Sequence, residues 1–263
     1  MSHQGFHGNL SSSPSLSVAP RLRLEEVSLR GIGTDLLLEK ISFVTQPGEI
    51  LGLVGASGSG KTSLLRLLNG LVSHSSGRVS LDRQPLEFYS PTELRRRLVL
   101  VPQEPRLLGM NVKEALSYPL KLQARSPEAI EAQIAIWTDL LRIPQEWLAK
   151  TELQLSLGQR QLVAIARGLM LQPQIILLDE PTSALDIGIA DRVLKVLQQL
   201  NQEQNLTIIM VNHQLEAIQN FCDRILLLER GRLLQDLVAT PANWQQVGEQ
   251  IRQLQSKIEQ EWL

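Results

Sequence analysis

Residues 55–62 of this chain read Gly55-Ala56-Ser57-Gly58-Ser59-Gly60-Lys61-Thr62. An apolar stretch, residues 50–54, precedes them, and a helix-like stretch, residues 64–71, follows. A strand, a glycine-rich loop and a helix in this order are the setting of a phosphate-binding loop. The glycines let successive backbone N–H groups face one anion, and the helix adds its positive N-terminal end. The stretch therefore predicts a site for phosphate groups.

Two side chains of this phosphate loop (residues 55–62) have expected roles of their own. Lys61 would reach the terminal phosphates, and Thr62 would hold Mg²⁺. The remaining expected contacts come from residues in or beside the loop: Gly55, Ser57, Gly58, Ser59, Gly60 and Ser63. The alternative is a flexible glycine turn, which the flanking strand and helix make less plausible.

Composition narrows the class of protein. The chain has 263 residues, a net charge of -1 and one cysteine, Cys222. This length suffices for one large domain or two small ones, and a single cysteine excludes an intramolecular disulfide. Near-neutral charge gives no sign of a nucleic-acid partner, because such proteins usually cluster basic residues. Apolar runs fall short of the roughly 20 residues that cross a bilayer, so work at a membrane would require a partner that spans it.

The order of apolar patterns predicts the architecture. Residues 1–20 are polar and serine-rich and are expected to be a disordered tail, not a signal peptide. Alternating patterns at 21–29 and 39–44 predict an antiparallel strand pair. Later apolar strands, at 174–178, 206–211 and 224–228, alternate with helices, which favours a parallel sheet covered on both faces. Residues 229–232 read as a hairpin turn.

Helix-start patterns fill the middle of the chain. Ser90, Asn111 and Ser126 are expected N-caps, so residues from about 104 to 153 are predicted to be mostly helical. We therefore expect an α/β fold: a phosphate-loop NTPase core with a mostly parallel sheet, an antiparallel β-subdomain and an inserted helical subdomain. The expected domain covers residues 21–237, with the helical subdomain at about 104–160, and a C-terminal helix follows at 238–263.

A pair of carboxylates follows an apolar strand at residues 175–180, Ile-Ile-Leu-Leu-Asp-Glu. The C-terminal ends of parallel strands open on the ligand crevice, beside the phosphate loop. Asp179 would hold Mg²⁺, directly or through water, and Glu180 would polarise the attacking water as general base. The alternative is that the two carboxylates only cap a helix, which the phosphate loop in the same chain disfavours.

A helix start with a capping-box pattern lies between these two sites. Residues 155–159 read Leu-Ser-Leu-Gly-Gln, and Ser156 with Gln159 fits the box. One interpretation is that the helix is simply well capped. A functional interpretation adds that its N-terminus offers a serine hydroxyl and free N–H groups to an anion.

Taken together, these motifs resemble those of ATP-binding cassette (ABC) ATPases, the nucleotide-binding subunits of ABC transporters. The resemblance covers about residues 22–237, and its elements stand in the order of that family. They are Walker A at 55–62, the Q-loop Gln103, the signature at 155–159, Walker B at 175–180, the D-loop Ser183-Ala184-Leu185-Asp186 and the switch histidine His213.

The resemblance implies an ATPase with ATP and Mg²⁺ as cofactors. Gln103 would contact Mg²⁺ or the water, and His213 would hold the γ-phosphate and the geometry of the base, Glu180. It further implies a head-to-tail dimer, either a homodimer or a paired cassette. Signature residues of one copy would close on the ATP held by Lys61 of the other, and the implied further nucleotide contacts are Ser156, Gly158, Gln159 and Asp186.

The implied partner is a multi-pass membrane permease, reached from the cytoplasmic face as a peripheral subunit. Docking is expected near Gln103 and residues 105–112, although these residues could equally be subdomain core. The surroundings of Gln103 resemble small bacterial cassettes whose permeases handle metal or phosphate. The alternative function is a soluble ABC ATPase of translation or DNA repair, a class that usually has paired cassettes, long insertions or zinc modules. A phosphate-loop kinase would lack the signature helix.

Two departures from the family pattern carry expectations. Leu157 replaces the usual first glycine of the signature, which would weaken closure if that position faces phosphate. The aromatic residue that stacks on adenine is missing, because Gly31 or Ile32 stands in its place and Phe43 is expected in the core. Stacking on an aromatic is worth about 1–3 kcal/mol per base, so we expect weaker ATP affinity and poor discrimination of ATP from GTP.

The last expected helix has one apolar stripe. Its members are spaced three or four residues apart: Trp244, Val247, Ile251, Leu254, Ile258 and Trp262. Packing against its own domain is the simpler explanation, and contact with a second subunit is the alternative.

Overall fold

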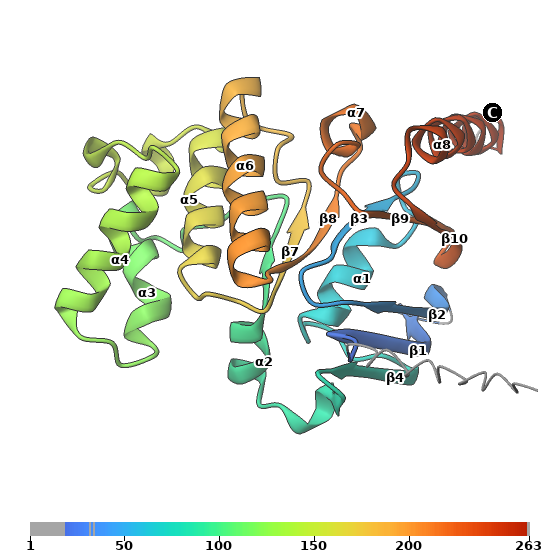
Figure 1. The fold of residues 1–263 in the computed structure, drawn as a ribbon, viewed down its shortest axis with the longest axis horizontal. Helices are drawn as coiled ribbons and strands as arrows, with labels where there is room; N and C mark the ends of the chain where they lie inside the picture. Colours follow the sequence, from blue (N-terminus) through green and yellow to red (C-terminus); the bar gives the residue numbers. More distant parts are fainter. Residues whose placement is uncertain (1–18, 32, 34, 262–263) are drawn as a thin grey trace, which may run out of the picture.

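The computed structural model describes residues 19–31, 33 and 35–261, with side chains to residue 256 (Figure 1). Two sheets and the helices around them make up the fold. The six-stranded sheet has the order β10-β9-β3-β8-β7-β6, and the four-stranded sheet has the order β2-β1-β4-β5. In chain order the strands are β1 (Leu22–Arg30), β2 (Leu36–Thr45), β3 (Ile50–Val54), β4 (Ser76–Leu81), β5 (Gln84–Pro85), β6 (Leu98–Val101), β7 (Ile175–Asp179), β8 (Thr207–Val211), β9 (Arg224–Glu229) and β10 (Arg232–Val238).

The larger sheet is parallel except for one edge strand. Strands β6, β7, β8, β3 and β9 pair in parallel, and β10 pairs antiparallel with β9. In the smaller sheet β1 pairs antiparallel with β2 and with β4. This arrangement confirms the expected α/β fold, with a mostly parallel core and an antiparallel β-subdomain.

Helices cover the sheet and form a group at one end. In Figure 1, α3 and α4 lie beyond α5, on the side of the molecule away from the antiparallel sheet. The α-helices are α1 (Lys61–Leu68), α2 (Pro91–Arg97), α3 (Val112–Lys121), α4 (Pro127–Leu140), α5 (Leu157–Leu169), α6 (Ile187–Gln204), α7 (Leu215–Ile218) and α8 (Pro241–Glu261). Short 3-10 helices occur at η1 (Leu86–Phe88), η2 (Gln145–Trp147) and η3 (Glu152–Gln154).

The two faces of the parallel sheet belong to separate apolar cores. In β3, Ile50 and Val54 join the core that holds α3 to α6, whereas Leu51 and Leu53 join the core of α1 and the antiparallel sheet. Successive side chains of a strand point to opposite faces, so one strand serves both cores. Because β3 is buried along its whole length, the loop that follows it starts from a fixed position.

Local capping chemistry sets several helix starts as predicted. Ser90, Asn111 and Ser126 each accept a hydrogen bond from a backbone N–H three residues later, and Asn111 has a full capping box. Helix α5 begins at Leu157, directly after the expected cap Ser156. The start of α1 was predicted too late: it begins at Lys61, not at residue 64, because the last residues of the phosphate loop already form the first helical turn.

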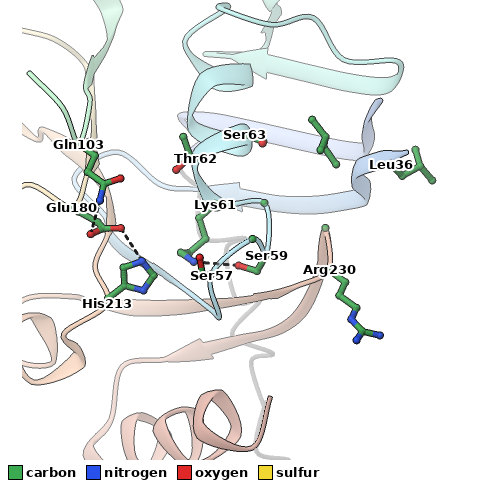
Figure 2. Close-up of a pocket in the computed structure, with 14 residues that line it drawn as sticks. Leu36, Ser57, Ser59, Lys61, Thr62, Ser63, Gln103, Glu180, His213 and Arg230 are labelled. Atoms are coloured by element: carbon green, nitrogen blue, oxygen red, sulfur yellow. Dashed lines mark hydrogen bonds and ion pairs between the residues drawn. The ribbon is translucent and has the colours of Figure 1, made fainter. Parts of the chain in front are cut away.

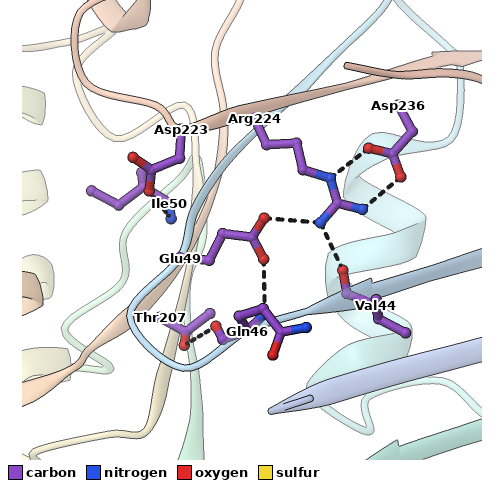
Figure 3. A network of polar contacts seen from close by, with 8 residues as sticks. All are labelled: Val44, Gln46, Glu49, Ile50, Thr207, Asp223, Arg224 and Asp236. Carbon is purple, nitrogen blue, oxygen red and sulfur yellow. Dashed lines mark hydrogen bonds and ion pairs between the residues drawn. The ribbon is translucent and has the colours of Figure 1, made fainter. Parts of the chain in front are cut away.

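Arg224 joins the two sheets (Figure 3). Its Nη1 donates to the backbone oxygen of Val44 at 2.9 Å and to Glu49 at 2.8 Å, and its Nη2 donates to Asp236 at 2.6 Å. Hydrogen bonding to Asp236 raises the pKa of Arg224 above its ordinary value. The neighbouring Asp223 accepts from the backbone N–H of Ile50 at 2.9 Å. Together these contacts fix β2, β9 and β10 around the start of β3.

The described part of the α8 stripe packs on the same domain. Trp244 and Val247 are buried, and Ile251 contacts the larger apolar core. A Cβ on Gly52 would lie 3.3 Å from the Trp244 ring, so the indole rests directly on β3. Leu254 is partly exposed, whereas Trp262 and the side chain of Ile258 lie outside the described residues.

Replacing Trp244 by Ala removes a side chain that is only 4% exposed. We expect W244A to lower the free energy of unfolding by about 3–5 kcal/mol, because a large cavity opens beneath α8. Urea denaturation followed by circular dichroism measures this. Gln246→Ala, on the exposed face of the same helix, should have little effect, and equal losses in both variants would contradict this packing.

Candidate nucleotide-binding site

The phosphate loop depends on glycines whose backbone conformation other residues rarely adopt. Gly55, Gly58 and Gly60 all have positive φ, at 149°, 75° and 102°. A Cβ on Gly55 would come within 2.1 Å of the Leu228 carbonyl oxygen, and one on Gly60 within 2.9 Å of the Leu37 carbonyl oxygen. The loop therefore packs between β9 and β2, and only glycine permits this approach.

Lys61 is held inside the loop. Its Nζ donates to the carbonyl oxygens of Gly55 and Ala56, both at 2.8 Å, and to Ser59 Oγ at 3.3 Å. Burial lowers the pKa of Lys61, while the nearby carboxylates of Glu180 and Asp179 act in the opposite direction. The ammonium group is thus positioned before any phosphate arrives.

A cavity of about 620 Å³ opens over this loop (Figure 2). It collects most of the predicted phosphate and catalytic residues into one place. Its lining consists of Leu36, Leu37, Ser57, Gly58, Ser59, Gly60, Lys61, Thr62, Ser63, Gln103, Glu180, His213, Arg230 and Gly231. Gly55 takes part through its carbonyl oxygen, which accepts from Lys61.

Glu180 lies at the centre of a polar cluster on one side of the cavity (Figure 2). Its Oε1 is 2.8 Å from His213 Nε2, and its Oε2 accepts from Gln103 Nε2 at 3.1 Å. The backbone of Glu180 has φ 51°, a left-handed conformation directly after β7. Such strain is found at functional sites, where surrounding contacts hold it in place. Here both carboxylate oxygens are oriented by residues from two other strand ends.

Asp179 and Thr62 have the chemistry of a magnesium site. Asp179 is 4% exposed, and burial raises the pKa of its carboxyl group, while a hydrogen bond from Thr62 acts against this. Within the described part of the chain its Oδ1 has no hydrogen-bond partner. A hard cation needs oxygen ligands such as these, and Mg²⁺ is usually bound by few protein groups together with phosphate and water. The residues present therefore fit Mg²⁺.

The signature residues lie apart from this cavity in the same chain. Ser156 Oγ accepts from the Gln159 N–H at 3.2 Å, and Gln159 Oε1 accepts from the Ser156 N–H at 2.9 Å, so the predicted capping box is present. Neither these residues nor Gly158 and Asp186 line the cavity. A Cβ on Gly158 would lie 2.4 Å from the Ala184 carbonyl oxygen, which explains why glycine is needed there. Leu157 is 46% exposed.

Four residues of the lining were missed by sequence reasoning. Leu36 and Leu37 belong to β2, and Arg230 with Gly231 forms the turn between β9 and β10. The turn itself was predicted, but its position over the phosphate loop depends on the sheet order.

Among the described lining residues there is no Phe, Tyr or Trp. Two positions were considered for the aromatic residue that stacks on adenine: Gly31 stands beside Leu37, and Ile32 lies outside the described residues. Phe43 is in the core, as expected.

A model of the family described as "ABC transporter" matches residues 38–183, more than half of the chain. The chain belongs to the ABC transporter family. Among residues that the structure describes, every helix is too short or too polar to span a bilayer.

Relatives of known name include two methionine import ATP-binding proteins MetN. That of Caulobacter vibrioides is 36% identical over 203 residues, 76% of this chain and 61% of its own length. That of Chlamydia pneumoniae is 34% identical over 220 residues, 81% of this chain and 64% of its own length. This ABC family chain thus spans less than two thirds of the length of these relatives.

Solved structures of other cassettes share the fold. A post-hydrolysis dimer of the ATP-binding cassette MJ0796 with ADP and Pi matches with a TM-score of 0.76 and 26% identity, over 83% of this chain and 99% of that one. CbiO1 from Clostridium perfringens, part of the ABC transporter complex cbiONQ, matches with a TM-score of 0.74 and 26% identity, over 91% of this chain and 99% of that one.

Replacing Lys61 by Met should weaken binding of Mg·ATP at least about tenfold, because a charge-assisted contact to phosphate is lost. Isothermal titration calorimetry measures the affinity, and thermal unfolding checks that the fold persists. Lys195→Met, in an exposed pair with Asp191 on α6, is the matched control. Unchanged binding in K61M would contradict the role of Lys61.

Proposed function

We propose that this chain is the ATP-hydrolysing subunit of an ABC transporter. The observation that carries the proposal is the Glu180 carboxylate, held between Gln103 and His213 across the cavity from Lys61. A carboxylate beside a phosphate loop is placed to act on a water molecule that attacks the terminal phosphate. Family membership supports the same reaction.

Each residue of the cavity has a part in that reaction. Lys61 and the loop N–H groups bind the phosphates, and Glu180 orients the attacking water and accepts its proton. Thr62 and Asp179 would hold Mg²⁺, which when bound neutralises charge that develops on the phosphates. His213 keeps Glu180 in place and contacts the γ-phosphate, while Gln103 links this cluster to the start of the helical region.

We further propose that two copies act head to tail. The nucleotide cavity of one chain is lined without Ser156, Gly158, Gln159 and Asp186. Their proposed contact with nucleotide therefore requires a second copy. The match to a dimeric cassette with ADP and Pi supports this arrangement. A soluble ABC ATPase of translation or DNA repair, the alternative, has no observation in its favour.

The proposed partner is a multi-pass permease, with this chain bound peripherally at the cytoplasmic face. In the expected docking stretch, Leu107 and Val112 are buried, whereas Leu108 is 73% exposed beside Arg106. Only part of that stretch is therefore available to a partner. In such transporters the permease selects the solute, so we propose neither methionine nor the metal or phosphate substrates considered above.

Glu180→Gln should keep Mg·ATP binding but lower turnover by at least about a hundredfold, because the general base is lost. A released-phosphate assay measures turnover, and light scattering should show an ATP-dependent dimer. Glu216→Gln, exposed on nearby α7, should leave both unchanged. Persistent turnover in E180Q would exclude Glu180 as the base.

The transporter assignment is tested by isolating the E180Q chain from its native membranes in mild detergent and identifying co-purified proteins by mass spectrometry. We expect one multi-pass membrane protein, or a matched pair, in stoichiometric amount with the chain. Recovery of ribosomes, DNA or soluble proteins alone would favour the alternative.

A further inference from the structure

Exposed apolar side chains surround the start of the signature helix. Leu153 in η3 is 96% exposed, Leu157 at the first position of α5 is 46% exposed, and Ile187 at the first position of α6 is 90% exposed. We call these three residues the signature face. A single exposed leucine is ordinary on a protein surface, but these residues flank Ser156 and Asp186, which are proposed to contact nucleotide.

The signature face belongs to one part of the surface. A Cβ on Gly158 would lie 2.4 Å from the Ala184 carbonyl oxygen, so the start of α5 lies against the segment that leads into α6. Leu153 stands four residues before Leu157, and residues 153–159 carry no formal charge. Depletion of charge together with exposed apolar groups is typical of the centre of a protein interface.

Leucine at position 157 is compatible with the structure around it. The close backbone approach is made by Gly158, and the capping box of Ser156 and Gln159 forms with Leu157 between its two members. The nucleotide cavity of the same chain is lined without Leu157. This side chain therefore neither enters its own nucleotide site nor disturbs the helix start, and its exposed surface is available to another molecule.

A second copy is the occupant that the geometry favours. In the proposed head-to-tail pair, Ser156 and Gly158 reach the nucleotide held by the other chain, and Leu157 stands between them. Consecutive Cα atoms are about 3.8 Å apart, so Leu157 then lies at the mouth of the other cavity. That mouth presents apolar groups of its own, since Leu36 and Leu37 line the cavity and are 44% and 42% exposed.

On the basis of the proposed function, we infer that the signature face packs on a second copy beside its nucleotide cavity, and that Leu157 strengthens the ATP-bound dimer. The physical reason is the burial of apolar surface, which a two-fold pair repeats in each of its two equivalent contacts. This is the reverse of the expectation from the family pattern, in which loss of the first signature glycine weakens closure.

The test uses the E180Q chain with Mg·ATP, and sedimentation equilibrium measures the dissociation constant of its dimer. We expect Leu157→Gly to raise this constant at least about tenfold, because apolar surface is lost from both contacts. Leu157→Met retains an apolar side chain of similar volume and should dimerise as E180Q does. Leu153→Ser should weaken the dimer in the same direction as L157G, and thermal unfolding checks that each variant is folded.

Leu234→Ser is the matched control, because Leu234 has a similar exposure of 48% on β10. Strand β10 is the edge of the large sheet opposite to β6. Helix α5 packs on β6, where a Cβ on Gly168 would lie 3.1 Å from Val99. The control thus removes an exposed leucine away from the signature face, and the dissociation constant of the dimer should not change.

The outcomes separate this inference from the proposed function. An ATP-dependent dimer of E180Q that L157G and L153S leave unchanged, or make tighter, would overturn the inference and leave the proposed function intact. If L157G instead reduces co-purification of the multi-pass membrane protein without changing the dimer, the signature face contacts the permease and the inference is wrong. Absence of any dimer in an E180Q chain that binds Mg·ATP would overturn both the head-to-tail proposal and this inference, while turnover by the wild-type chain still tests the ATPase proposal by itself.

Discussion

The site depends on the close backbone contact of the phosphate loop with β2 and with the β9–β10 hairpin. Gly55, Gly60 and Gly231 meet neighbouring carbonyl oxygens at distances that exclude a Cβ. Their missing side chains bring three segments that are far apart in the sequence into direct contact. Because β3 is buried along its length, the loop cannot move away from these neighbours. The orientation of the loop N–H groups and the place of Leu36, Leu37 and Gly231 beside the cavity both follow from this packing.

Charged groups are buried at the phosphate end of the cavity, where burial is unfavourable for stability. Burial lowers the pKa of Lys61 and raises the pKa of Asp179, and both shifts favour the neutral form of the group. Glu180 adds a left-handed backbone conformation, which costs on the order of 1–3 kcal/mol. These costs have a common benefit, because groups fixed in advance need little reorganisation when substrate binds. The apolar cores on both faces of the sheet offset them.

The signature helix follows a different principle. Its start is stabilised locally, by the reciprocal hydrogen bonds of Ser156 and Gln159. Its place relative to the D-loop is set by Gly158, which contacts the Ala184 carbonyl oxygen where a side chain would clash. One chain thus contains a complete phosphate cavity and a separate, well-formed helix start that leaves this cavity untouched. This separation is what makes two copies necessary in the proposed mechanism.

Local sequence determined the features that rest on short-range physics. The phosphate loop, the N-caps at Ser90, Asn111 and Ser126, and the carboxylates after β7 could all be predicted, because glycine freedom, capping and apolar periodicity act within a few residues. The grouping of Gln103, Glu180 and His213 was anticipated from family resemblance, but their hydrogen bonds required the strand order. Only the tertiary structure shows that Leu36, Leu37 and Arg230 line the cavity. Their position depends on the pairing of β9 with β3 and on contacts between segments nearly two hundred residues apart, such as Glu39 with Gly231, which no local pattern encodes.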